Sequence, residues 1–382
     1  MRPFVLGGLL AVSALVASAE PKKAVLEKIT VDQLQQELRA ASGKDDIGLA
    51  QQLSTFELSE RLGTALLAKL DAGASGEKSR QALLLLADKS AFLEPPAADV
   101  PADSTPDPAT TRQMLVKMVN YVNTTLRQLP NLLASRDTTG FEDSPQEDAL
   151  EATGIVSYSY QPLHFVGESI ATVTYRDRKE VVDASVAKST KQGSKVGGLT
   201  TTGEFGPILS TTLADALKGK ITWARWEQGA SGKVAVFHYE VPEEKSNYRV
   251  QFCCVVNGFN SDNTPDLQVF DEKSAYHGEI AFDPADGTIL RMTLQAELHP
   301  HELVSNAGLV VEYAPVEIAG KSYVCPSRSI SVLEAHTAQL HGMYSKTNYQ
   351  GPSKTFLNDV VFGQYRRFGS ESRILVGENP AP

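Results

Sequence analysis

The chain of 382 residues has few cysteines and none of the short motifs typical of the common catalytic families. Its three cysteines, Cys253, Cys254 and Cys325, show no Cys-x-x-Cys spacing, which argues against a dithiol redox centre or a cysteine-rich zinc site. It also contains no Gly-x-Ser-x-Gly elbow, no His-Glu-x-x-His motif and no phosphate-binding glycine loop. The sequence therefore predicts a protein that is not an enzyme and that uses no cofactor.

Basic residues are scarce relative to acidic ones. The chain carries 36 Lys and Arg against 46 Asp and Glu, a formal net charge of −10. Nucleic-acid-binding proteins need a basic surface to match the phosphates, so this balance argues against a nucleic acid as partner. Beyond the first nineteen residues no apolar run is long enough to cross a bilayer, and no transmembrane segment is predicted there.

Residues 1–19 have the three parts of a secretory signal peptide. Arg2 supplies the positive start, residues 4–16 are almost all apolar, and Ala17-Ser18-Ala19 is a small-x-small cleavage sequence. No cysteine stands at the cleavage point, so lipid attachment is not expected. The segment predicts export to the periplasm or the extracellular space, and its loss, which removes Arg2 and no acidic residue, changes the net charge from −10 to −11.

Three cysteines in an oxidising compartment allow one disulfide and leave one thiol. In the alternating pattern around Phe252, Cys254 shares the apolar face and Cys253 the polar face. Only one member of this adjacent pair can readily reach Cys325 without distorting its strand. We expect a disulfide between Cys254 and Cys325, with Cys253 as the alternative partner.

Apolar residues recur at helical spacing in the first third of the chain and predict a small helical domain over residues 20–135. Capping signals mark three helix starts: Thr30 with Gln33, Asp45 or Asp46, and Asp107 before Pro108. The proline-rich stretch 94–108 is predicted to be a loop. The polar and acidic residues 136–154 are interpreted as a linker.

From residue 155 onward the apolar pattern has period two, with turn signals about every ten residues, as expected for antiparallel strands. Residues 221–227 pair with 234–241 in one predicted hairpin, and residues 278–282 with 288–298 in another. The predicted fold class is α+β. A small helical domain precedes a curved antiparallel sheet, or incomplete barrel, over residues 155–376 with one or two covering helices, and residues 377–382 form a disordered tail.

Several stretches of the carboxy-terminal half carry a family pattern: residues 276–284 with Gly287, residues 289–291, residues 311–313 and residues 361–368. They resemble bacterial exported proteins of the outer-membrane lipoprotein-sorting, or lipoprotein carrier-like, family. The resemblance implies an incomplete antiparallel barrel whose helices close an apolar cavity for acyl chains. The amino-terminal part, with residues 129–131 and 136–139, resembles a companion segment of uncharacterised secreted bacterial proteins.

The aromatic residues of the predicted sheet are the candidate ligand site: Trp223, Phe237, Tyr239, Phe252 and Phe282. A curved sheet that is not filled leaves an apolar groove, which these side chains are expected to line. The simpler alternative is that they pack against the helices. Because Trp223 and Trp226 are an odd number of residues apart, we expect them on opposite faces of a regular strand.

His299 and His301 are two residues apart, and together with His336 and His341 further along the chain they are the candidate metal ligands. Pro300 places the first two in a turn, and no motif frames them, so no metal site is predicted. The leading hypothesis is a non-catalytic envelope protein that binds a lipid or an acylated protein in the sheet cavity, with the helical domain available to an envelope partner. A structural scaffold with a filled cavity is the alternative, followed by an exported metal-dependent hydrolase.

Overall fold

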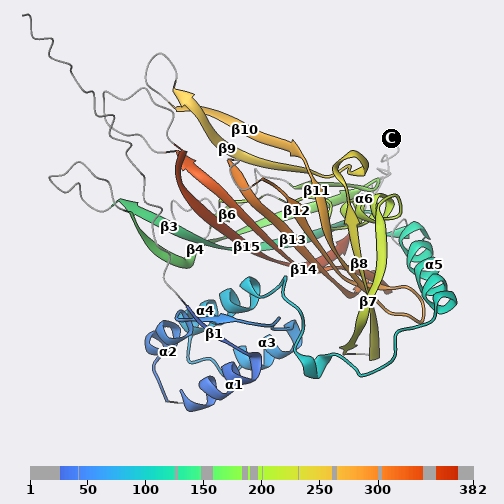
Figure 1. Cartoon of the computed structure of the whole chain (residues 1–382), viewed down its shortest axis with the longest axis horizontal. Coiled ribbons are helices and arrows are strands. Elements are labelled where there is room, and N and C mark those ends of the chain that lie inside the picture. The colour runs from blue at the N-terminus through green and yellow to red at the C-terminus, as the bar shows by residue number, and fades with distance from the viewer. Residues whose placement is uncertain are drawn as a thin grey trace, which may run out of the picture.

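The computed structural model describes residues 26–41, 43–124, 128–147, 158–182, 188–189, 197–199, 201–230, 232–259, 265–299, 303–338 and 350–368. The predicted signal peptide and tail lie outside these residues. The described chain forms a helical unit, residues 26–93, and a large antiparallel sheet with two further helices (Figure 1). This arrangement confirms the predicted α+β class.

The helical unit consists of β1 (Glu27–Ile29), α1 (Val31–Ala40), α2 (Asp46–Leu53), β2 (Phe56–Leu58), α3 (Thr64–Asp71) and α4 (Glu77–Lys89). Both predicted caps are confirmed. Thr30 and Gln33 exchange two hydrogen bonds at the start of α1, and the Asp45 carboxylate accepts the Gly48 N–H at the start of α2. Leucines at helical spacing, among them Leu34 and Leu83, form a core that belongs to this unit alone.

A connector, residues 94–107, leads from the helical unit to α5 (Pro108–Thr124) and contains one turn of 3₁₀ helix, η1 (Ala97–Asp99). The Asp107 carboxylate accepts the N–H groups of Ala109 and Thr110 at 2.8 and 3.0 Å, which confirms the predicted cap. Met118 on α5 is fully buried against the sheet, so α5 belongs to the sheet's core. The predicted boundary at residue 135 is therefore too late, since the helical unit ends near residue 93.

The strands of the large sheet are β3 (Leu132–Glu147), β4 (Tyr158–Arg176), β5 (Lys179–Val182), β6 (Lys188–Ser189), β7 (Lys220–Gly229), β8 (Gly232–Val241), β11 (Ala275–Phe282), β12 (Ile289–Glu297), β13 (Val304–Ile318), β14 (Lys321–Ala338) and β15 (Gln350–Arg367). Their order is β5-β4-β3-β15-β14-β13-β12-β11-β8-β7, with β6 pairing β4 beside this path. The described sheet is open, because β5 and β7 stand at opposite ends of the order. Both predicted hairpins, β7–β8 and β11–β12, are present. β9 (Arg249–Phe259) and β10 (Pro265–Lys273) form a separate ribbon.

The predicted linker, residues 136–154, is wrong over residues 136–147, which belong to strand β3. It lies between β15 and β4 and pairs with both along its length, while residues 148–154 are outside the described chain. Its polar side chains suggested a solvated segment, yet Arg136 and Asp143 are buried and satisfied. Arg136 donates to the Thr201 carbonyl at 2.7 Å, and Asp143 accepts the Thr355 N–H at 2.6 Å. Buried polar groups are tolerated when they are hydrogen-bonded, which composition alone does not reveal.

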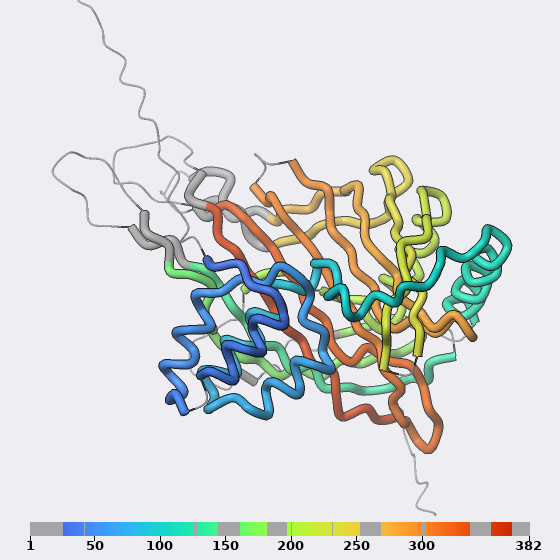
Figure 2. Tube along the Cα trace, turned by 60° about the horizontal axis from the view of Figure 1, so that its bottom comes forward, coloured from blue at the N-terminus to red at the C-terminus, as the bar shows by residue number. Residues whose placement is uncertain are grey.

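The two faces of the sheet are covered by different parts of the chain. The inner face carries α5 and α6 (Pro207–Ala216), and residues 197–199 also pack on it. The Asn358 amide donates to the Gly197 carbonyl at 2.9 Å, and the Ser331 hydroxyl donates to the Leu199 carbonyl at 3.4 Å. The outer face carries the helical unit, which Figures 1 and 2 show beside β14 and β15 and away from α5.

Candidate functional site

The five aromatic residues predicted to line a ligand cavity lie in the protein core. Trp223, Phe237, Tyr239 and Phe282 belong to the cluster under α5 and α6, and the last three have no exposed surface. Phe252 belongs to a different cluster, where its ring lies 5.7 Å from that of Phe356. None of the five lines the cavity of about 720 Å³ beside β4 or the cavity of about 790 Å³ beside α5.

The two tryptophans of β7 lie on the same side of the strand, contrary to expectation. Their rings are 4.7 Å apart in an edge-to-face arrangement. A register shift between Trp223 and Arg225 breaks the pairing of β7 with β8, so that Trp223 faces Phe237 and Trp226 faces Ala235. An extra residue in a strand, a β-bulge, allows side chains an odd number of positions apart to lie on the same face.

Cys325 is a free, buried cysteine in this structure, so the predicted disulfide with Cys254, or alternatively Cys253, is not formed. Its side chain packs in the core cluster that contains Phe205 and Phe362. Burial raises the pKa of the Cys325 thiol to about 12, which keeps it protonated and unreactive at neutral pH. The side chains of Cys253 and Cys254 are outside the described part of β9.

The described structure contains only part of the predicted histidine set. His299 is exposed after β12, His336 is half-buried near the end of β14, and His301 and His341 lie outside the described residues. Within the described chain there is no group of three or more His, Cys, Asp or Glu side chains placed to hold a metal ion.

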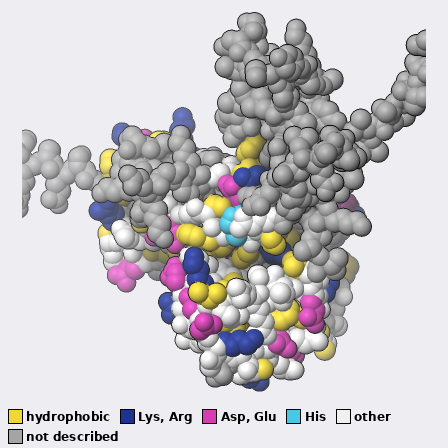
Figure 3. All heavy atoms as spheres, turned by 90° about the vertical axis from the view of Figure 1, so that its left-hand side faces the viewer, with side chains coloured by type: hydrophobic (Ala, Val, Ile, Leu, Met, Phe, Trp, Pro, Cys, Tyr) yellow, Lys and Arg dark blue, Asp and Glu magenta, His cyan; other side chains and the backbone are white. Residues whose placement is uncertain are grey.

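The candidate site is a cavity of about 720 Å³ between the helical unit and the outer face of the sheet, hereafter the interface cavity. Figure 3 views the molecule from this side, where hydrophobic side chains lie between the helical unit below and the sheet above. The helical unit contributes residues from α2, β2 and α4, and the sheet contributes residues from β3, β4 and β15. The cavity therefore exists only because the two parts meet.

The walls of the interface cavity are apolar on both sides. Leu53 and Phe56 line it from the helical unit, and Phe141, Leu163 and Phe165 line it from the sheet. The rings of Phe141 and Phe165 lie 6.3 Å apart at 74°, an edge-to-face contact that orders this wall. Such a lining favours a hydrophobic ligand, since apolar surface gains free energy when it leaves water.

Polar groups lie at the rim of the interface cavity. The Lys78 ammonium lies 5.9 Å from the centre of the Phe165 ring, and Lys89 also lines the site. The backbone N–H groups of Ser79 and Lys78 donate to the Asp46 carboxylate and lower its pKa, which fixes the start of α4 beside the rim. Glu57 and the buried Asp143 also line the cavity, so a mainly apolar interior carries carboxylates as well as the ammonium group near its opening.

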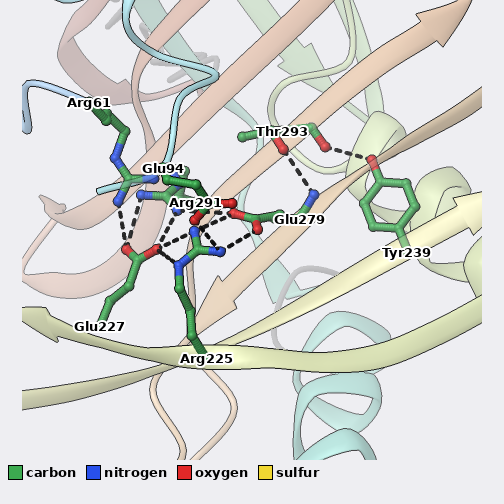
Figure 4. Close-up of polar contacts among 8 residues, drawn as sticks. All are labelled: Arg61, Glu94, Arg225, Glu227, Tyr239, Glu279, Arg291 and Thr293. Carbon is green, nitrogen blue, oxygen red and sulfur yellow. Dashed lines mark hydrogen bonds and ion pairs between the residues drawn. The ribbon is translucent and has the colours of Figure 1, made fainter. Parts of the chain in front are cut away.

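Beyond the cavity, the helical unit and its connector meet the outer face through ion pairs (Figure 4). Arg61 pairs with Glu227 at 2.7 Å, and Glu94 pairs with Arg225 at 2.9 Å. Burial alone would raise the pKa of Glu227, but the guanidinium groups of Arg291, Arg61 and Arg225 outweigh it and lower the pKa to about 2. Glu227 therefore remains ionised at neutral pH.

A second buried ion cluster joins α4 to β14 and β15. Arg328 binds Asp88 of the helical unit and also Asp359, the latter at 2.6 Å. Burial, and then the neighbouring Asp359 carboxylate, raise the pKa of Asp88 well above its usual range despite the attraction of Arg328. One guanidinium thus serves two buried carboxyl groups across the contact.

Sequence reasoning found neither the interface cavity nor the ion clusters. Arg61, Asp88, Glu227 and Arg328 are separated by tens to hundreds of positions, and only the fold brings them together. The one local signal was the spacing of Arg225 and Glu227, which places both charges on the same face of a strand. A charged pair of that kind ordinarily indicates a solvated face.

No family model and no curated protein matches the chain. Among solved structures, a DUF1329 family protein from Desulfovibrio piger is similar with 9% sequence identity and a TM-score of 0.23, over 70% of this chain and 96% of that chain. OmpT, an outer membrane protein of Vibrio cholerae in its trimer form, is similar with 8% identity and a TM-score of 0.10, over 61% and 100%. In the described residues, the helices are too short or too polar to traverse a membrane.

Proposed function

We propose that this protein is an exported, non-catalytic binding protein that holds an acyl chain in the interface cavity. The observation that carries the proposal is the cavity itself, about 720 Å³ with apolar walls from both the helical unit and the sheet. This volume is within the range of roughly 300 to 1,000 Å³ typical of small-molecule sites. Export is supported by the signal-peptide pattern of residues 1–19.

The chemistry of the site fits a ligand with one apolar and one anionic end. Chain atoms buried against Phe56, Phe141 and Phe165 gain about 25 cal/mol for each Å² removed from water, before ordering costs are subtracted. The ammonium of Lys78 at the rim attracts a carboxylate or phosphate at the other end. A free fatty acid, a phospholipid and an acylated protein share this chemistry.

A charge placed in the wall should weaken binding. Leu163→Glu introduces a carboxylate into the apolar lining, whereas Ile170→Glu makes the same change on the same strand at a side chain that is 45% exposed. We expect Leu163→Glu to weaken the binding of a fluorescent long-chain fatty acid by about tenfold or more, since 1.4 kcal/mol corresponds to a factor of ten. Ile170→Glu should bind like the wild type.

Native mass spectrometry of protein purified from its own cell envelope distinguishes the sources of the acyl chain. A fatty acid, a phospholipid and a lipid-modified peptide give different adduct masses. The proposal predicts an acyl adduct on the wild type and on Ile170→Glu that is lost from Leu163→Glu. Unliganded protein that also binds no fatty-acid probe would contradict the proposal and favour a scaffold.

A further inference from the structure

We propose that the helical unit is a gate that moves away from the sheet to admit the ligand, and that the ion pairs with the outer face are the latch that holds it closed. This inference rests on the proposed function, because it concerns entry to the interface cavity. Both walls of that cavity are brought together by the docking of the helical unit, so a separation of the two parts opens it directly.

The helical unit can move as a body because its core is its own. The cluster that contains Leu34, Leu53 and Leu83 includes no residue of the sheet. Among the described residues, the only apolar cluster that joins the two parts is small: Ala91, with Phe92 beside it, packs on Val310 and Ile330. Separation therefore exposes little apolar core surface on either side.

The contacts outside this small cluster are mainly polar. Arg61 with Glu227, Glu94 with Arg225, and Asp88 with Arg328 all cross from the helical unit or its connector to the sheet. Buried ion pairs gain Coulomb energy but lose hydration, so each pair stabilises the closed state by only a modest net free energy. Such pairs fix the position in which the helical unit docks. Opening them costs less free energy than opening a continuous apolar interface.

The pivot lies where the chain leaves the unit. Phe92 is in close contact with Gly308, where an added Cβ would stand 2.8 Å from the Phe92 ring, and the connector is fixed to β7 by the bond of the Trp226 indole to the Ser104 carbonyl. Helix α4 lines the cavity from Lys78 to Lys89, and Lys78 lies about 15 Å from Asp88 at 1.5 Å per residue. A rotation about Phe92 therefore moves the Lys78 end of α4 further than the end that carries Asp88.

A reversible crosslink tests the gate. Thr64 and Glu312 are exposed or partly exposed side chains that hydrogen-bond across the contact at 2.7 Å. Thr64→Cys with Glu312→Cys, in a background of Cys253→Ser and Cys254→Ser, places one thiol on each side of the contact between the helical unit and β13. A bis-methanethiosulfonate reagent joins the two thiols through two disulfides, which gives the oxidised protein, and reduction cleaves the link. The measurement is the association rate of a fluorescent long-chain fatty acid with the oxidised and the reduced protein, alongside a Thr64→Cys single variant.

The gate predicts that oxidation slows association by at least tenfold and that reduction restores it, with the single variant unaffected by either treatment. Equal rates in both redox states, with normal affinity, would overturn the gate and leave the proposed function standing. No binding by any form, including the wild type, would overturn the proposed function itself.

Loosening the latch gives a second, independent measurement. Arg61→Ala removes one cation from the contact, whereas Arg80→Ala removes an exposed arginine whose partner, Asp71 at 3.9 Å, lies within the helical unit. We expect Arg61→Ala to accelerate association of the probe severalfold and Arg80→Ala to leave it unchanged. If the two variants behave alike, the ion pairs are not the latch.

Discussion

Glu180 is half-buried on the inner face beside the fully buried Glu204, and the Arg136 guanidinium lies 3.6 Å from Glu204. Burial, and then the Glu204 carboxylate, raise the pKa of Glu180 from 4.5 to about 8. Glu180 is therefore protonated in the folded protein at pH values where it would be ionised in the unfolded chain. Its contribution to stability is complete below about pH 4.5 and is lost as the pH rises toward 8.

Because stability falls as Glu180 ionises, Glu180→Gln should remove this pH dependence. The variant keeps an acceptor for the Gly203 N–H but cannot ionise. The unfolding temperature of the wild type should fall as the pH rises from 5 to 9, and the unfolding temperature of the variant should fall by less. Glu168→Gln, an exposed change on β4, is the matched control and should follow the wild type. Parallel pH profiles for all three proteins would show that Glu180 does not titrate in this range.

Arg328 forms ion pairs with Asp88 and Asp359, and all three side chains are buried. Arg328→Met leaves both acidic residues without a cation, and removing one partner of a buried ion cluster typically costs about 3 to 5 kcal/mol. Urea unfolding should show a loss of that order. Arg80→Met, at an exposed arginine, should change the free energy of unfolding by less than about 0.5 kcal/mol.

At the scale of elements, local signals predicted most helices and hairpins, because their causes are local. The Thr30 and Asp107 caps and the alternation of β8 need only neighbouring residues. Strand β3 and the bulge at Trp223 were missed, because both are decided by partner strands far away in the sequence. Arg136 and Asp143 of β3 are hydrogen-bonded to Thr201 and Thr355, which no pattern within the strand can show.

The cap of α5 provides a test at this scale. Asp107→Ala removes the acceptor for two backbone N–H groups, those of Ala109 and Thr110, and should lower the free energy of unfolding by about 1 kcal/mol. Asp99→Ala, an exposed change in η1, is the matched control. Equal unfolding midpoints in urea for the two variants would contradict a stabilising role for this cap.

At the scale of the whole molecule, the fold class followed from the sequence but the site did not. Four of the five predicted aromatic residues belong to the core under α5 and α6, and Phe252 belongs to the cluster that also contains Leu199, because α5, α6 and residues 197–199 pack on the inner face. The interface cavity forms on the opposite face, where the docking of α2 and α4 leaves space beside β3 and β4. Docking geometry depends on contacts such as Arg61 with Glu227, which join distant parts of the chain.

The most direct measurement is a crystal structure of the protein with a long-chain fatty acid that carries bromine at the end of its chain, whose anomalous signal locates that end. The account predicts a bromine peak between Phe56 and Phe141, with the carboxylate toward Lys78. A peak on the inner face beside Phe237 and Tyr239, or a bound fatty acid anywhere outside the interface cavity, would contradict it.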